Sequence, residues 1–203
     1  DDIKVGENVT VSVNVPSDAT GNVIVTVDGK DYTVAIVDGK AVKTIADLKA
    51  NNYTVTVKYA GDNNYNPNQN TTKFTVSKIS DYNMNITVPG DVKVGEDAVI
   101  IVNVPKDASG NVTVSVGKDV YNAAISNGSV KVVVSGLGAG VYNVSATFAD
   151  DKYAQNKANA TVVVSKVTDY NMNVSVPEFK EGVNSTISVD LPKDATGTVT
   201  VEI

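Results

Sequence analysis

The 203-residue sequence contains no cysteine, histidine, tryptophan or arginine, and these absences exclude several classes of function. Without cysteine there is no disulfide framework and no thiolate site; without histidine the usual general base and the commonest metal ligand are missing. The 17 basic residues are all lysine and the formal net charge is −6, whereas nucleic-acid binding requires a basic surface. A serine, threonine or aspartate nucleophile would have no histidine or cysteine to complete a triad, so we expect no enzymatic activity and no catalytic residues.

Long apolar segments are also absent. No run approaches the roughly 20 residues that span a bilayer, so we expect no membrane contact in this segment. No secretory signal is recognisable. The sequence starts inside a repeat without an initiator methionine, so we expect it to be part of a longer chain.

One stretch is present three times, beginning at Val15, Val104 and Leu191, which are 89 and then 87 residues apart. Each copy is an alternating apolar and polar run that ends at proline, then a polar turn that ends at glycine, then a second alternating run. This pattern predicts a β-hairpin. Its recurrence at a nearly constant period predicts an array of like domains.

Residues 79–166 contain the most complete repeat. Alternating segments occur at Met84–Val88, Ala98–Val104, Val112–Val116, Tyr121–Ile125, Val130–Val134, Tyr142–Phe148 and Ala160–Val164. About seven short alternating strands separated by turn signals are typical of an immunoglobulin-like sandwich. The predicted fold is therefore all-β, with tandem sandwich domains of about seven antiparallel strands each.

The other two repeats are partial. Residues 1–78 form a repeat without its first strand, because Asp1 aligns with Gly90. In that repeat Lys43 aligns with Val132 and would point inward, which predicts a β-bulge or an edge position. Residues 167–203 hold the first three strands of a third repeat, around Met172–Val176, Ile187–Leu191 and Val199–Ile203. Three strands leave an inner face uncovered, so either the chain continues or a neighbouring molecule completes this repeat.

The joints between repeats, residues 77–82 and 165–170, are short and rich in neither glycine nor proline. Such joints predict a semi-rigid rod rather than loosely tethered domains.

Two segments resemble a known family. Leu137–Val144 and Leu48–Val55 resemble the Leu-x-Ala-Gly-x-Tyr-x-Val entry to the sixth strand of immunoglobulin-like repeats, which places Tyr142 and Tyr53 as tyrosine corners. Tyr59–Pro67 resembles the Tyr-x-Gly-Asp-x-x-Tyr-x-Pro signature of the bacterial and archaeal Ig-like repeats of group 3. The second copy, Phe148–Gln155, departs from this signature by losing the glycine, the proline and one residue.

The composition is similar to that of the adhesin-like surface proteins of methanogenic archaea. This resemblance implies an extracellular location on the cell surface and a role as a stalk or fibre. The resemblance implies no catalytic residue in this sequence.

Ten Asn-x-Ser/Thr sequons are candidates for N-glycosylation, which would require an exposed position in an exported protein. They are Asn8, Asn52, Asn70, Asn85, Asn111, Asn127, Asn143, Asn159, Asn173 and Asn184. The same pattern is also how a strand alternates polar and apolar residues.

Three further groups of residues have a functional interpretation beside a structural one. The first is the loop aspartates, which could hold Ca²⁺ at the joints or simply close Asx-turns: Asp18, Asp62, Asp107, Asp150, Asp151 and Asp194. The second is Lys43, Gln69 and Gln155, which are candidates for an internal cross-link. The third is four tyrosines that could bind glycan or pack at the joints: Tyr65, Tyr82, Tyr153 and Tyr170. We expect no obligatory cofactor.

Three functions remain open at this point. The first is a structural stalk or fibre of an extracellular adhesin-like protein, which projects or connects cell-surface functions and contacts neighbouring repeats of the same chain. The second is an adhesive module that binds a glycan or protein of a host or cell wall. The third is a filament subunit that copies of itself complete by strand exchange.

Overall fold

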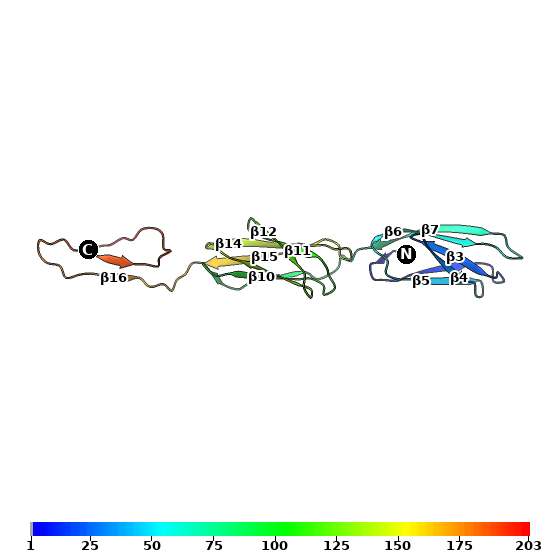
Figure 1. Cartoon of the computed structure of the whole chain (residues 1–203), viewed down its shortest axis with the longest axis horizontal. Helices are drawn as coiled ribbons and strands as arrows, with labels where there is room; N and C mark the ends of the chain where they lie inside the picture. The colour runs from blue at the N-terminus through cyan, green and yellow to red at the C-terminus, as the bar shows by residue number, and fades with distance from the viewer. Residues whose placement is uncertain (1) are drawn as a thin grey trace.

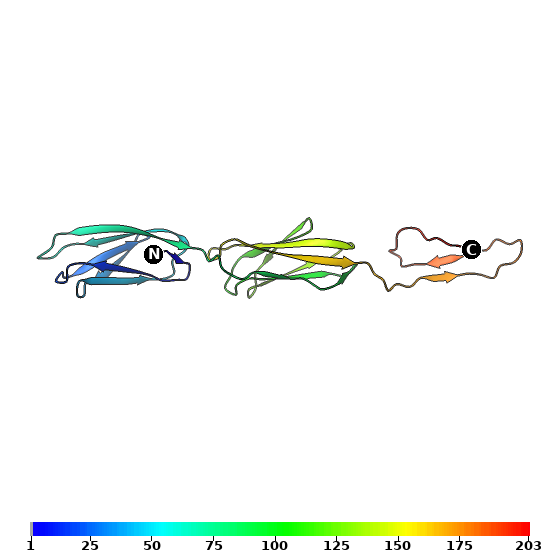
Figure 2. The ribbon, with the colours of Figure 1, turned by 180° about the vertical axis from the view of Figure 1, so that it is seen from behind.

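The computed structural model describes residues 2–203, and these residues form an all-β protein of three bodies arranged in a row (Figure 1). The same linear order is seen from behind in Figure 2. No helix of a length and apolarity sufficient to cross a membrane occurs among the described residues. The first two bodies are immunoglobulin-like sandwiches, and each has its own cluster of buried side chains.

The first repeat is built from strands β1 to β7. Their bounds are β1 Ile3–Lys4, β2 Val9–Asn14, β3 Asn22–Val27, β4 Lys30–Ala35, β5 Lys40–Ile45, β6 Asn51–Tyr59 and β7 Asn68–Ser77. One sheet has the order β1-β7-β6-β3-β4, and the facing sheet consists of β2 and β5. β6 is central in the larger sheet, where it pairs antiparallel with β3 and with β7.

The second repeat has the same arrangement with one strand more. Its strands are β8 Asn85–Thr87, β9 Val92–Lys93, β10 Ala98–Asn103, β11 Asn111–Val116, β12 Asp119–Ala124, β13 Ser129–Val134, β14 Gly140–Phe148 and β15 Asn156–Ser165. The larger sheet has the order β12-β11-β14-β15-β9, and the smaller sheet has the order β13-β10-β8. The extra strand β8 pairs antiparallel with the outer edge of β10.

Period-two alternation of valine with polar residues explains both sandwiches. In β11 the side chains of Val112, Val114 and Val116 are buried, whereas Asn111 and Thr113 are exposed. Successive residues of a strand point to opposite faces of the sheet, so one face packs inward and the other meets water. β-branched valine suits such a half-buried pleated surface.

The repeated proline-to-glycine turn does not form a hairpin, contrary to the sequence prediction. β2 and β3 lie in different sheets, and so do β10 and β11. The turn closes locally, with Ala108 N donating to the Pro105 carbonyl at 3.0 Å. It then carries the chain across the sandwich, where the next strand pairs with β6 or β14 instead. Local turn chemistry is the same for both connections, so the sequence pattern could not separate them.

A tight turn does occur at Asn127-Gly128 between β12 and β13, where it closes the isolated bridge Ser126↔Ser129, although β12 and β13 themselves lie in different sheets. Both residues have positive φ, 50° and 72°, as a type I′ turn requires. The turn packs against the segment after β10, because a Cβ on Gly128 would lie 2.9 Å from Lys106 Cα. The sequence signal at this position therefore has two causes, the turn geometry and the close approach of another loop.

Lys43 occupies a regular edge strand, so the expectation of a bulge is wrong and the edge interpretation fits. β5 pairs with β2 without interruption from Val9↔Ile45 to Asn14↔Lys40. Lys43 is half-buried, and its Nζ lies 5.1 Å from the centre of the Tyr32 ring. A long side chain on an edge strand can cover the core with its methylenes while its ammonium reaches solvent.

The alternation pattern does not predict the two short strands β1 and β9, because two residues are too few to show alternation. β1 pairs in parallel with β7, and β9 pairs in parallel with β15. Each repeat therefore departs from a purely antiparallel pattern at one edge of its larger sheet.

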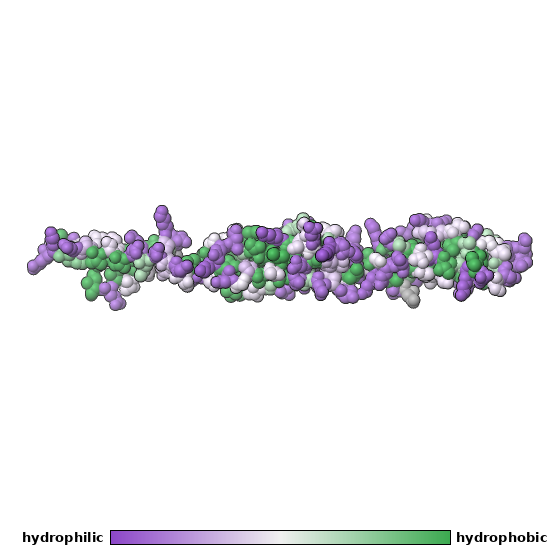
Figure 3. All heavy atoms as spheres, turned by 90° about the horizontal axis from the view of Figure 1, so that it is seen from below, coloured by the Kyte–Doolittle hydropathy of each residue, from purple (hydrophilic) through white to green (hydrophobic). Residues whose placement is uncertain are grey.

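The third repeat contains only β16 Asn173–Ser175 and β17 Ser188–Asp190, which pair with each other. The predicted strand at Val199–Ile203 is not present. Its counterpart β11 pairs with β12 and β14, and residues 167–203 include no such partners. Apolar side chains remain exposed as a result, among them Met172, Val174 and Val176. Figure 3 shows hydrophobic atoms at the surface of this end of the molecule.

The aligned residues Val102 and Val13 provide a test of core packing. Val102 is fully buried, whereas Val13 is half-buried. We expect Val102→Ala to destabilise the second repeat by about 2–3 kcal/mol, from two lost methyl groups and the cavity that remains. We expect Val13→Ala to destabilise the first repeat by about half of that or less. Hydrogen exchange in increasing denaturant, resolved by mass spectrometry of each repeat at low protein concentration, measures both values. Equal costs would contradict the difference in burial.

Candidate functional site: the joint between repeats

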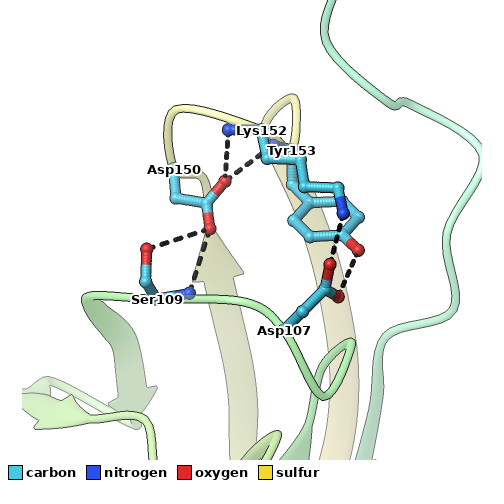
Figure 4. Close-up of polar contacts among 5 residues, drawn as sticks. All are labelled: Asp107, Ser109, Asp150, Lys152 and Tyr153. Atoms are coloured by element: carbon cyan, nitrogen blue, oxygen red, sulfur yellow. Dashed lines mark hydrogen bonds and ion pairs between the residues drawn. The ribbon is translucent and has the colours of Figure 1, made fainter. Parts of the chain in front are cut away.

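A single carboxylate organises the end of the second repeat that faces the first. Asp150 follows β14, and its Oδ1 accepts hydrogen bonds from the backbone N–H groups of Lys152 at 2.8 Å and Tyr153 at 2.6 Å. Its Oδ2 accepts from the backbone N–H of Ser109 at 3.0 Å (Figure 4). Asp150 thus closes its own loop and fixes that loop to the turn between β10 and β11.

A second aspartate binds the same loop from the opposite side. Asp107 Oδ1 accepts a hydrogen bond from the Tyr153 hydroxyl at 2.7 Å, and its Oδ2 forms an ion pair with Lys152 (Figure 4). The hydrogen bonds from Lys152 and Tyr153 lower the pKa of Asp107 below its ordinary value. Burial of the phenol and its hydrogen bond to Asp107 raise the pKa of Tyr153 to about 12.

We call this pair of aspartates, with the loop and the turn that they bind, a clasp. The first repeat has the same clasp in its own residues. Asp62 Oδ2 accepts from Thr20 N at 2.8 Å, and its Oδ1 accepts from Asn64 N at 2.8 Å and Tyr65 N at 2.9 Å. The Tyr65 hydroxyl donates to Asp18 at 2.7 Å. These backbone donors, Thr20 first, hold the pKa of Asp62 well below its usual range.

The Gly-Asp-x-x-Tyr part of the signature follows from this geometry. Gly61 has a φ of 84°, and a Cβ at this position would lie 2.4 Å from the Tyr65 carbonyl oxygen. Asp62 supplies the carboxylate, and Tyr65 supplies the hydroxyl that reaches the neighbouring turn. The second repeat lacks the glycine, but its loop has one residue fewer before Asp150 and forms the same hydrogen bonds.

The chain leaving the first repeat is attached directly to the clasp of the second repeat. Ile79 forms a parallel bridge with Tyr153, in which Ile79 N donates to the Lys152 carbonyl and Ala154 N donates to the Ile79 carbonyl, both at 2.9 Å. The Lys78 ammonium also donates to the carbonyl of Asp150. Since β7 ends at Ser77, only one residue separates the last strand of the first repeat from the bridge.

Tyr82 then packs into the second repeat. Its ring lies edge-on to Phe148 and Tyr153, with ring centres 6.1 Å and 4.9 Å away. Its hydroxyl donates to the Ala154 carbonyl at 2.7 Å, and Asn156 Nδ2 donates to the Tyr82 carbonyl at 3.3 Å. The aromatic packing and the two hydrogen bonds fix the direction in which the chain enters β8.

An exposed ion pair occurs at equivalent positions of both joints. Lys4 Nζ lies 2.9 Å from Asp81 Oδ1, and Lys93 Nζ lies 3.6 Å from Asp169 Oδ1. Asp81 raises the pKa of Lys4, and Lys4 in turn lowers that of Asp81. The contact connects the short parallel strand of one repeat to the segment that leads into the next.

The remaining predicted residues are placed as follows. The Tyr53 hydroxyl donates to the Lys49 carbonyl at 2.9 Å and that of Tyr142 to the Gly138 carbonyl at 3.0 Å, which is the geometry expected of a tyrosine corner.

The asparagines of all ten sequons are exposed. Gln69 lies in β7 and Gln155 just before β15, both exposed, whereas Lys43 lies in the opposite sheet in β5.

Residues 2–203 contain no group of three or more His, Cys, Asp or Glu side chains placed to hold a metal ion. The carboxylates of Asp18, Asp62, Asp107 and Asp150 instead accept hydrogen bonds within the clasps. Asp151 and Asp194 are exposed. Of the four tyrosines, Tyr65 and Tyr153 belong to the clasps, Tyr82 packs at the joint, and Tyr170 is exposed.

Comparison with known proteins agrees with this geometry. Residues 1–77 match the family model described as a bacterial Ig-like domain (group 3). The match spans the first repeat. The Asp62 clasp and the Tyr53 corner therefore lie within the matched group 3 domain. No curated protein matches the sequence.

Solved structures resemble the chain in fold. Fibronectin(III)-like modules of CbhA from Clostridium thermocellum align over 81% of this chain and 90% of their own, with 12% identity and a TM-score of 0.35. The ICAM-5 D1–D4 ectodomain fragment aligns over 92% of this chain and 57% of its own, with 13% identity and a TM-score of 0.48. SGBP-B of Bacteroides ovatus, solved in complex with a mixed-linkage heptasaccharide, aligns over 81% and 42%, with 16% identity and a TM-score of 0.32.

The depressed pKa of Asp62 predicts acid sensitivity of the first repeat. The folded-state pKa lies below the unfolded value of about 3.9, so the stabilisation is complete above that value and is lost as the pH falls through the folded pKa. We expect the first repeat to lose stability below about pH 4. In Asp62→Asn, which keeps one acceptor oxygen but no charge, stability at neutral pH should be lower and this acid-dependent loss should be smaller.

Thermal unfolding of each repeat between pH 7 and pH 2, followed by NMR, measures this effect. Asp31→Asn is a suitable control, because the exposed Asp31 of β4 accepts a hydrogen bond from the Thr26 side chain and none from a backbone N–H of residues 2–203. An unchanged acid profile in Asp62→Asn would contradict the role assigned to the clasp.

Proposed function

We propose that this chain is a structural repeat region of an extracellular adhesin-like surface protein, where it acts as a semi-rigid stalk or fibre that projects or connects functions at the cell surface. Its task is mechanical and involves no catalysis. Each sandwich supplies length, and each joint preserves direction from one repeat to the next.

The joint supports this proposal most directly. Two backbone hydrogen bonds at Ile79, the packing of Tyr82 and the Lys4–Asp81 ion pair hold the connecting segment against both repeats. A flexible linker would have glycine-rich or polar residues without such contacts. Restraints on both sides of a one-residue connection limit bending as well as twisting.

The family and the surface chemistry support the extracellular location. Bacterial Ig-like domains of group 3 are typical of surface proteins. Ten exposed sequons would be compatible with a carbohydrate coat on an exported protein. Immunodetection of this region on intact cells, with and without added protease, tests the location. Labelling only after cell lysis would contradict it.

Small-angle X-ray scattering of the 203-residue chain tests the stiffness of the rod. β15 has 10 residues, which at about 3.3 Å per residue gives roughly 33 Å for each repeat. We expect a narrow distribution of long end-to-end distances. A four-residue Gly-Ser insertion between Ser77 and Lys78 should broaden the distribution and shorten its mean, because it separates β7 from the bridge at Ile79.

The same insertion in the exposed Gly117-Lys118 turn is the matched control, since this turn adds length without entering the connection between β7 and Ile79. Lys4→Ala should leave the thermal stability of both repeats unchanged while it widens the distribution slightly. An unmodified chain as flexible as the insertion variant would overturn the stalk proposal.

A further inference from the structure

Two lysine side chains of the first repeat converge on one tyrosine. Lys30 Nζ lies 5.2 Å and Lys43 Nζ 5.1 Å from the centre of the Tyr32 ring. Because both distances are measured from the same ring centre, the two ammonium nitrogens are no more than about 10 Å apart. We call these three residues the lysine–tyrosine cluster.

The cluster lies where the two sheets of the first repeat meet at one edge. Tyr32 of β4 pairs with the buried Val25 of β3, and Lys30, two residues earlier, is on the same inner face. Lys43 comes from β5 of the facing sheet, which contacts β4. The strands β3, β4 and β5 that form this edge all lie within residues 22–45. In the second repeat the additional strand β8 is on the opposite side of the smaller sheet.

The second repeat shows that the fold does not require this cluster. There the tyrosine is kept as Tyr121, whereas Asp119 takes the place of Lys30 and Val132 that of Lys43. Val132 is 4% exposed and completes the core with its methyl groups. The first repeat instead has an ammonium group at this edge from each sheet. The two charges are therefore a property of this repeat and not of the sandwich in general.

The donors of the cluster are not used by the rest of the protein. Among residues 2–203 neither lysine ammonium forms an ion pair, since the ion pairs of these residues involve Lys4, Lys93 and Lys152. Asp31 follows Lys30 in the chain, but its carboxylate accepts a hydrogen bond on the outer face of the sheet. The hydroxyl of the cluster tyrosine also has no hydrogen-bond partner within residues 2–203. All three groups are free to donate to a ligand.

This set of groups has the chemistry of a site for an anionic sugar. Ammonium and phenol groups donate to carboxylate or sulfate oxygens, and such charge-assisted hydrogen bonds are stronger than neutral ones. Lysine side chains are flexible, so each ammonium can move from the ring to a ligand oxygen. The half-buried ring of Tyr32 then offers an apolar surface on which the C–H groups of a sugar ring can pack.

We propose that the lysine–tyrosine cluster binds a carboxylated or sulfated sugar unit of an acidic polysaccharide. Lys30 and Lys43 donate to the anionic group, and Tyr32 contacts the sugar ring. An acidic peptide has similar charges, but it would bind by adding a strand to β4. That edge strand has only six residues and begins with lysine, and both features disfavour strand addition. The rod would thus hold a polysaccharide at its side.

NMR titration of the 203-residue chain with hexagalacturonate tests the site, and maltohexaose is the uncharged control. We expect a dissociation constant of the order of 1 mM, because ion pairs near the surface are weak. Amide signals of β4 and β5 should shift, whereas those of the equivalent β12 and β13 should not. Equal shifts in both repeats, or equal binding of maltohexaose, would overturn the proposal. So would the absence of binding by both hexagalacturonate and a sulfated hexasaccharide.

Two lysines of β5 provide a matched pair of variants. Lys43→Val and Lys40→Ser each introduce the residue that the second repeat has at the equivalent position, so both variants should fold. Each removes one positive charge, but Lys40 is on the outer face of the strand, away from the cluster. We expect Lys43→Val to weaken binding about fivefold and Lys40→Ser less than about twofold. Equal losses would show a general attraction between charges and would overturn the site.

Hexaglutamate with blocked termini separates recognition of a sugar from recognition of charge. It has as many side-chain carboxylates as hexagalacturonate but no sugar ring to pack on Tyr32. We expect it to bind at least about threefold more weakly. Equal affinity would overturn the assignment to a polysaccharide. The inference goes beyond the stalk function and fails separately from it, since a chain that binds no acidic sugar can still be stiff in X-ray scattering.

Discussion

A carboxylate that accepts backbone hydrogen bonds from two loops is the contact on which the arrangement of repeats depends. Asp62 and Asp150 each bind donors of their own loop, and each also binds the backbone N–H and the hydroxyl of one residue in the turn before β3 or β11. Charge-assisted hydrogen bonds of this kind are stronger than those between neutral groups. They fix the loop in a single conformation, which places Tyr65 or Tyr153 against the core.

The joint is built on this fixed loop. Because Tyr153 is held by Asp107 and Asp150, its backbone presents an ordered edge that Ile79 can extend. Tyr82 finds a preformed aromatic surface for the same reason. The direction of the rod is therefore set by side chains inside one repeat, and the connecting segment itself needs few contacts of its own. Preorganisation of the loop reduces the entropy cost of ordering that segment.

The sequence predicted what alternation and turn chemistry can encode. Valine at every second position identified the long strands and their inward faces, and Asn127-Gly128 marked a tight turn. The family signature located Asp62 and Tyr65 as a pair. It did not indicate that Asp18, 44 residues earlier than Asp62, receives the tyrosine hydroxyl, because long-range contacts leave no local pattern.

Other features lay outside what the pattern contains. β1 and β9 are too short to alternate, and their parallel pairing depends on the edge of a sheet formed by distant residues. The turn at Pro105 looks like a hairpin locally, but β14 takes β11 as a partner. In the third repeat Val199 and Val201 have strand-like spacing yet form no strand, since strand formation requires a neighbour as well as a propensity.

The positions at which the chain enters and leaves a sandwich determine how that sandwich would carry tension. In the second repeat the chain enters through β8 and leaves through β15 at the opposite end, so a pull along the rod shears whole ladders of hydrogen bonds at once. The tensile strength of the second repeat would then equal the resistance of these ladders to shear, because neither end strand can be peeled off one hydrogen bond at a time.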